Sequence, residues 1–214
     1  YIIFIIMGLA ITLTLTNMFT FISLLSPLFI IFFTILSSII NNQLVKGLIL
    51  NMGIVIVSGI IYLLKNILKN HQSEHSSPFC NILPAPFTVP GGETDVIYDN
   101  PSLSTGILSF VSTYLIYPMI INNQLNPGVL MFLIILLVIN IGVENKLYCC
   151  GLMGSFMGVL VGIIFAMIYY TILRLNNNEN LLYFTQTFSD NMQCSKPLDK
   201  TFKCTIYKNG VPLN

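Results

Sequence analysis

The sequence predicts an all-α integral membrane protein: a bundle of six transmembrane helices with a small polar C-terminal appendage. Of its 214 residues, 55% are hydrophobic and only 8% are charged, whereas an ordinary soluble domain has about 25% charged residues. The mean hydropathy is +0.82, and the apolar runs exceed the roughly 18 residues that indicate a spanning helix. This excludes a water-soluble globule, a coiled coil and a disordered chain. The net charge of +1 attracts no nucleic acid, so we expect no such partner.

The first 40 residues are almost wholly apolar. One helix of that length would measure about 60 Å, twice the roughly 30 Å of the hydrocarbon core. We therefore expect two helices, the first near 1–16 and the second ending at Ile40. The turn between them would lie around Asn17 or between Ser23 and Pro27.

Four more helices are expected at about 44–69, 101–121, 128–143 and from beyond residue 146 to Arg174. Pro101 suits a first helical turn, where its missing N–H would have no partner. Gly154, Gly158 and Gly162 recur every four residues in the last helix, which predicts a seam for close helix packing. Six helices would put both termini on one side of the membrane, and the basic residues of the tail favour the cytosol for that side.

Two segments are expected outside the bundle of residues 1–175. The loop at 70–100 is polar and contains four prolines, and it is longer than unstructured connections usually are. In the tail, residues 176–214, strand-like alternation at 201–207 precedes an Asn-Gly turn signal at 209–210. This pattern predicts a small β-hairpin outside the membrane.

The five cysteines do not resemble the framework of a small disulfide-rich protein. Cys149 and Cys150 lie in an apolar stretch, where thiols behave as small hydrophobes. Cys194 and Cys204, in the polar tail, form the only pair that we expect to be capable of a disulfide.

The segment 71–75 has the letters of the inverted zinc-protease signature, with a histidine at each end and Glu74 before the second. That signature needs a helix that presents both imidazoles to one metal ion. Ser76, Ser77 and Pro78 would end any helix at once, and no third ligand stands at a suitable spacing. We interpret the segment as a solvated loop and expect neither a metal nor another cofactor.

Glu144 and Lys146 lie near a helix junction in apolar surroundings. An ionisable residue inside a membrane indicates a functional site by default. A short turn in the headgroup layer would also hold both residues at little cost. The sequence favours the turn and leaves the functional site open.

Three tracts in order carry a family resemblance: Lys65–Lys69 at a helix end, Asn100–Ser104 at the next helix start, and the glycine-spaced last helix. From about Leu24 to Tyr170 the chain resembles membrane lipid phosphatases of the type 2 phosphatidic acid phosphatase superfamily, especially dolichyl-diphosphatase-like members. In that family Lys and Arg bind the phosphate, one His forms a phosphoenzyme, and a second His held by Asp handles the protons. The resemblance implies that these groups meet at one membrane face.

The first two motifs of that family are half retained. Lys65 takes the place of the phosphate-binding Lys, but Gln72 and Ser73 stand where the family has Arg and Pro. The Pro-Ser-Gly-His motif falls on residues 101–104, which are Pro, Ser, Leu and Ser. A seryl hydroxyl at the position of the acid/base His does not titrate near neutral pH.

The third motif keeps two glycines, at 158 and 162, and loses its reactive groups. Glu144 stands in place of the Arg, Cys150 in place of the nucleophilic His, and Gly154 in place of the Asp. A carboxylate repels the phosphate that an Arg would bind, and Cys150 has no histidine to activate it. The resemblance therefore implies the fold and argues against the activity. The residues left at the former phosphate or headgroup site would be Lys65, Lys69, Ser102, Ser104, Lys146 and Cys150.

The segment Cys194–Gly210 resembles C-terminal segments of small membrane proteins from large icosahedral DNA viruses. The two resemblances imply a catalytically inactive, multi-pass structural or assembly component of the internal membrane of such a virus particle. Its partners would be membrane lipids and other membrane or capsid proteins, contacted through the 70–100 loop and the tail. The alternative is a lipid phosphatase with a divergent site, or a protein that binds lipid headgroups through its lysines. A transporter is disfavoured because few polar residues lie within the apolar runs.

Overall fold

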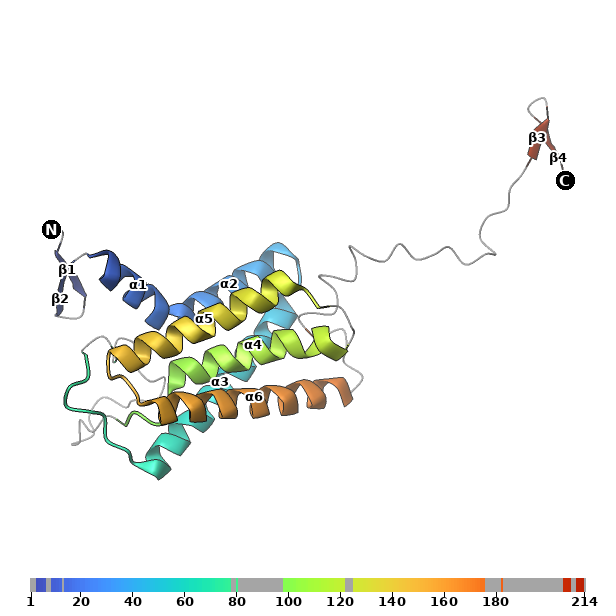
Figure 1. Ribbon diagram of the computed structural model, residues 1–214. Helices are drawn as coiled ribbons and strands as arrows, with labels where there is room; N and C mark the ends of the chain where they lie inside the picture. Colours follow the sequence, from blue (N-terminus) through green and yellow to red (C-terminus); the bar gives the residue numbers. More distant parts are fainter. Residues whose placement is uncertain are drawn as a thin grey trace.

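Figure 1 shows the computed structural model of the chain. It describes residues 3–6, 9–12, 14–77, 80, 98–121, 125–175, 182, 206–208 and 211–213. The helices are α1 (Leu15–Leu24), α2 (Ser26–Ile40), α3 (Leu44–Leu68), α4 (Leu103–Ile121), α5 (Pro127–Lys146) and α6 (Leu152–Leu175). The strands are β1 (Ile3–Ile6), β2 (Leu9–Thr12), β3 (Ile206–Lys208) and β4 (Val211–Leu213).

The described helices form a bundle with the character of an integral membrane protein. Within these residues, four helices, α3 to α6, are long and apolar enough to cross a membrane. Helices α1 and α2 together make a fifth candidate span, bent by 58°. The described helices therefore provide four spans, or five if the bent pair α1 and α2 is one span, whereas the apolar runs predict six.

The start of the chain differs from the predicted helix at 1–16. Two antiparallel strands, β1 and β2, occupy part of that stretch, and α1 begins only at Leu15. β-branched residues, which favour strands, make up most of β1 and β2. The Thr14 hydroxyl then accepts a hydrogen bond from the Asn17 N–H at 3.3 Å and caps the helix. The position of a cap, and not the length of the apolar run, determines where α1 begins.

The predicted turn between Ser23 and Pro27 is confirmed. Helices α1 and α2 are separated at Leu25, and the Ser26 hydroxyl donates to the Ser23 carbonyl at 2.6 Å. Pro27 lies in the first turn of α2, where its missing N–H leaves no gap in the helical hydrogen bonds.

The later helices agree with the prediction except at their ends. Helix α3 matches the predicted 44–69 closely. Helix α4 begins two residues after Pro101, and α5 extends beyond the predicted end at 143 to Lys146. The residues that were expected to interrupt the apolar run are thus the last turn of α5, and the connection to α6 is 147–151.

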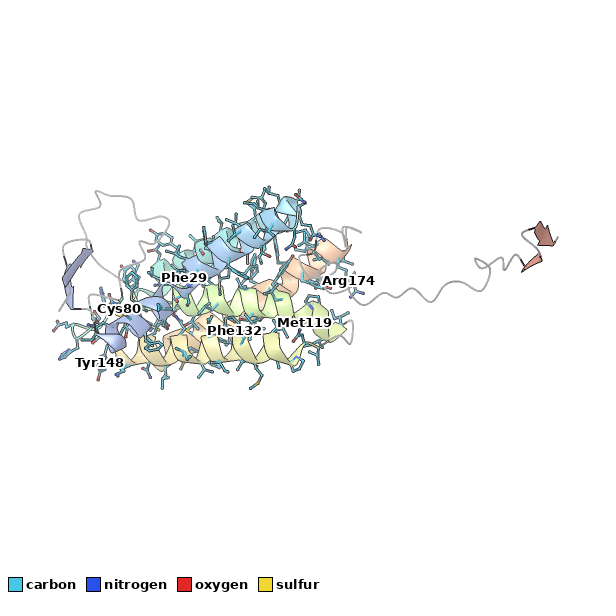
Figure 2. All side chains as sticks on the ribbon, turned by 90° about the horizontal axis from the view of Figure 1, so that it is seen from above. Phe29, Cys80, Met119, Phe132, Tyr148 and Arg174 are labelled. Atoms are coloured by element: carbon cyan, nitrogen blue, oxygen red, sulfur yellow. A yellow bond between two sulfur atoms is a disulfide. The ribbon has the colours of Figure 1, made fainter. Side chains whose placement is uncertain are left out.

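The two ends of the bundle are separated in Figure 2, which labels Cys80 and Tyr148 at one end and Met119 and Arg174 at the other. We call the first the disulfide end, because Cys80 forms a disulfide there, and the second the tail end, because α6 finishes there. Figure 1 shows that α1 begins at the disulfide end and α6 finishes at the tail end. The prediction that both termini lie on one side is therefore wrong for the helical part of the chain.

The glycine seam of α6 is confirmed, and α4 fills it. A Cβ added at Gly158 would lie 2.7 Å from the carbonyl oxygen of Ser102, just before α4, and one added at Gly162 would lie 2.5 Å from that of Gly106 in α4. The two backbones approach closely, as small residues permit in membrane helices. The Ser109 hydroxyl donates to the Val159 carbonyl at 2.9 Å across this interface. Of the four single-helix spans, α4 is the most buried, so the other helices surround it.

Aromatic rings fill the tail-end half of the interface between α4 and α6. The ring centroids of Phe110 and Phe165 are 5.6 Å apart, and Tyr169 lies 6.0 Å from both Phe110 and Tyr114. The Tyr169 hydroxyl donates to the Ile49 carbonyl of α3 at 2.7 Å. These contacts hold α3, α4 and α6 together.

The hairpin predicted in the polar tail is confirmed: β3 and β4 pair antiparallel, with Ile206 opposite Leu213. The predicted disulfide partners Cys194 and Cys204 lie outside the described residues.

Candidate functional site

A disulfide joins Cys80 to Cys149 across 69 residues of sequence. This corrects two expectations, that Cys149 is only a small hydrophobe and that the tail cysteines are the only candidate pair. Two hydrogen bonds accompany the disulfide. The Ser77 N–H donates to the Leu147 carbonyl at 3.0 Å, and Gln72 Nε2 donates to the Cys149 carbonyl at 3.5 Å. The α3–α4 connection therefore lies against the turn after α5, a contact that cysteine spacing does not reveal.

Glu144 lies inside the bundle, 4% exposed, in the last turn of α5. Its carboxyl group accepts hydrogen bonds from Ser102 Oγ, just before α4, and from Thr105 Oγ1 of α4, both at 2.7 Å. The Cys150 thiol donates to it at 3.8 Å. Glu144 therefore lies in the last turn of α5 with protein donors in place of water, and not in a solvated turn as the favoured interpretation expects. Lys146 is exposed, as a residue of such a turn would be.

Asn140, one turn further into the bundle, extends these polar contacts. Its Oδ1 accepts hydrogen bonds from Ser104 Oγ and Thr105 Oγ1, each at 3.3 Å. Its Nδ2 donates to the Ser23 carbonyl, at the end of α1, at 3.0 Å. Sequence reasoning missed Asn140 and Thr105. The available signal was that Asn140 and Glu144 are four residues apart and so share one face of α5.

Lys65 approaches the same place from the last turns of α3. Its Nζ donates to the Tyr98 carbonyl at 3.2 Å, and its charge interacts with those of Glu144 and Asp99. The side chain is half-buried. We call this group of residues, which joins α3, α4, α5 and the α5–α6 turn, the polar end cluster: Lys65, Ser102, Ser104, Thr105, Asn140, Glu144 and Cys150.

The structure brings together four of the six residues expected at a former headgroup site, and they are Lys65, Ser102, Ser104 and Cys150. The other two, Lys69 and Lys146, are exposed. Neither of them contributes to the interactions of Glu144 or Cys150. Of the three lysines, only Lys65 enters the described cluster.

Cys150 is a buried thiol, 4% exposed. Its Sγ lies 3.2 Å from Ser155 Oγ of α6. Burial, and then the charge of Glu144, raise the pKa of the Cys150 thiol to about 11. Because the thiolate is the nucleophilic form, Cys150 at neutral pH is a hydrogen-bond donor and a poor nucleophile.

Asn100 occupies the space that Gly154 leaves. A Cβ added at Gly154 would overlap the Asn100 Oδ1 atom. Asn100 Oδ1 and Asp99 Oδ1 are buried and accept no hydrogen bond within the described part of the chain. Burial raises the pKa of the Asp99 carboxyl, although backbone N–H groups and Lys65 oppose the shift. At the position where the resemblance implies a catalytic Asp, an amide from a different segment therefore fills the gap.

The histidine segment 71–75 is not helical, so the structural context of the zinc-protease signature is missing. His71 pairs with Tyr98 in an isolated β-bridge, and their rings are 5.7 Å apart. Among the described residues, no group of three or more His, Cys, Asp and Glu side chains could hold a metal ion.

No protein-family model, curated protein or solved structure matches the chain. The class of the protein therefore rests on its own helices, which are those of a helical integral membrane protein. The polar end cluster can join four segments of the bundle through hydrogen bonds. In the described residues it contains one cation, Lys65, and no imidazole.

Proposed function

We propose that the chain is a multi-pass membrane protein whose lipid-phosphatase-like bundle is catalytically inactive and acts as a structural or assembly component of a membrane. The observation that carries this proposal is the environment of Glu144. The family resemblance puts a phosphate-binding Arg at this position, and here a carboxyl group accepts hydrogen bonds from Ser102 and Thr105. A charged carboxylate would repel phosphate, and a neutral one would not attract it. At the position where the resemblance puts a phosphate-binding side chain, Glu144 instead joins α5 to α4 through hydrogen bonds.

Two neighbours support the same conclusion. Lys65, the retained half of the phosphate clamp, donates to the Tyr98 carbonyl. Cys150, at the position of the nucleophilic His, is buried and has a pKa near 11. Each group has a partner within the bundle, as groups with a structural role do.

The test is phosphate release by the purified protein in detergent, with phosphatidic acid, diacylglycerol pyrophosphate and a polyprenyl diphosphate as substrates. We expect no release above that of protein-free micelles. Lys65→Ala and Cys150→Ala are the matched variants, because each removes one residual group of the site. Phosphate release by the natural chain would overturn the proposal if Lys65→Ala or Cys150→Ala abolished it. Loss of release in Lys65→Ala would identify Lys65 as a phosphate-binding residue, and loss in Cys150→Ala would identify Cys150 as a nucleophile.

Headgroup binding is the second candidate, and the half-buried Lys65 amine is the observation that favours it. It loses support because Lys69 and Lys146 are exposed and do not converge with Lys65 on the cluster. Binding of vesicles with and without phosphatidic acid headgroups distinguishes the two roles. Headgroup binding would be favoured if the natural chain preferred the anionic vesicles, if Lys65→Ala removed this preference, and if the control Lys69→Ala kept it.

The proposed location is the internal membrane of a large DNA virus particle, on the strength of the resemblance of the tail at 194–210. Disulfides persist in oxidising compartments, so we place the disulfide end away from the cytosol. The tail end then faces the cytosol, which agrees with Arg174 and with the lysines of the tail. In sealed vesicles with the cytosolic face inside, protease should spare a tag on the tail until the membrane is permeabilised. Cleavage before permeabilisation would reverse the orientation.

A further inference from the structure

Residues 70–77 and Cys80, which we call the strap, cross from α3 to the turn after α5 at the disulfide end. On one side the strap contacts the segment before α4: the Asp99 N–H donates to the Asn70 carbonyl at 3.2 Å, and His71 forms a bridge with Tyr98. On the other side the disulfide to Cys149 and two hydrogen bonds join it to the turn. The strap thus connects the two segments that flank the polar end cluster.

The strap has little packing of its own. Each residue from 70 to 77 is exposed or half-buried. A segment with few buried contacts and a few hydrogen bonds opens at low free energy. The bond between Cys80 and Cys149 is the only covalent contact of the described strap residues, and the hydrogen bonds beside it are each weak by comparison.

We infer that the Cys80–Cys149 disulfide is a redox latch, and that its reduction frees the strap and opens the polar end cluster to water and solutes. The reductant is a dithiol. One of its thiolates attacks a sulfur of the disulfide, the S–S bond breaks, and the second thiolate resolves the mixed disulfide. Cys80 and Cys149 each gain one electron and one proton, and the dithiol leaves as a disulfide. This inference goes beyond the structural role proposed above and holds whether or not the cluster is catalytic.

Cys150 is a natural reporter of this opening. It follows the latch residue Cys149 directly, it belongs to the cluster, and it is the described cysteine that is not in a disulfide. While the strap is held, burial and the raised pKa keep its thiol unreactive. Access of water would lower that pKa and allow alkylation.

The experiment measures the alkylation rate of Cys150 by a maleimide, in detergent at neutral pH, with modification read by peptide mass spectrometry. The background chain carries Cys194→Ser and Cys204→Ser, and the latch-free chain carries Cys80→Ser and Cys149→Ser in addition. We expect alkylation of Cys150 to be at least roughly tenfold faster without the latch. Adding Cys150→Ser to the latch-free chain should abolish the modified peptide.

Two further measurements of the Cys150 alkylation rate complete the test. Reduction of the background chain by dithiothreitol, followed by removal of the dithiol, should accelerate Cys150 alkylation equally and does not depend on the folding of the serine variant. Gly47→Val destabilises the tail end, where a Cβ at Gly47 would overlap Ser38, and leaves the latch intact. The inference is wrong if reduction leaves the Cys150 rate at its background value, or if Gly47→Val accelerates alkylation as much as loss of the latch does.

Discussion

The two halves of the α4–α6 interface are held by different interactions. Toward the tail end, the rings of Phe110 and Tyr114 of α4 pack at tilted angles against Phe165 and Tyr169 of α6. Toward the disulfide end, the same helices meet backbone to backbone at Gly158. There the polar end cluster connects α4 to α3, α5 and the turn before α6.

In this bundle, one half of the interface supplies apolar packing, and the other half supplies hydrogen bonds that depend on particular side chains. Lipid tails are as apolar as the helices, so association depends on close packing and on hydrogen bonds between helices. The aromatic half supplies packing that many apolar sequences could provide. The polar half needs a complete set of partners, because an unsatisfied carboxyl group is costly inside a membrane. We therefore expect the properties that depend on particular polar side chains to be located at the disulfide end.

The largest expected effect comes from the glycine seam, which both halves share. Gly158→Leu should lower stability by about 3 kcal/mol or prevent folding, since its Cβ would lie 2.7 Å from the rigid Ser102 carbonyl. Thermal unfolding in detergent, followed by circular dichroism, measures this. Gly142→Leu is the control, because nothing lies within 4 Å of a Cβ there. Equal melting of the two variants would show that the seam does not set the helix contact.

Truncation of the aromatic half should have the next largest effect. Phe110 has no exposed surface, and Phe110→Ala should cost about 3 kcal/mol through lost packing and the cavity left behind. Phe132→Ala removes a ring that is 62% exposed on α5, and it should change the melting temperature in detergent little. A loss at Phe132 as great as that at Phe110 would mean that the outer face of α5 is packed against another molecule.

Loss of the carboxyl group tests the polar half directly. Glu144→Ala leaves the Ser102 and Thr105 hydroxyls without their acceptor, and we expect a loss of about 1 to 2 kcal/mol. Denaturant titration measures it, with the exposed Glu74→Ala as the matched control. If Glu144→Ala is more stable than the natural chain and also releases phosphate, the carboxyl group is a block on an active site and not a structural tie.

The smallest effect is a dependence on alkaline pH. The pKa of the Cys150 thiol rises from 9.0 to about 11 on folding, so the folded state prefers the protonated thiol. The resulting stability is full below pH 9 and is lost as the pH rises through 11, with a cost of about 1.4 kcal/mol at pH 10. Melting curves across this range should show the loss, and Cys150→Ala should reduce it. An unchanged slope in Cys150→Ala would assign the loss to other groups.

Part of the candidate site was predictable from the sequence. Family resemblance pointed to Lys65, Ser102 and Cys150, and the structure places all three at one end of the bundle. It did not point to Thr105 or Asn140. The four-residue spacing of Asn140 and Glu144 indicates a shared face of α5, but it does not reveal which hydroxyl groups of α4 meet that face. The burial of Glu144 was missed because its donors lie around the start of α4, 39 to 42 residues away in sequence.

The sequence by itself determined the helical membrane class, the turn between Ser23 and Pro27, the glycine seam and the hairpin in the tail. Each of these follows from local quantities, such as the length of an apolar run, the position of a proline or the spacing of small residues. Only the tertiary structure decided that Cys80 pairs with Cys149, that α1 and α2 meet at a bend of 58°, and that a carboxyl group lies inside the bundle. The reason is physical: a disulfide and a buried carboxyl group depend on which distant side chains meet, and no local pattern contains that distance.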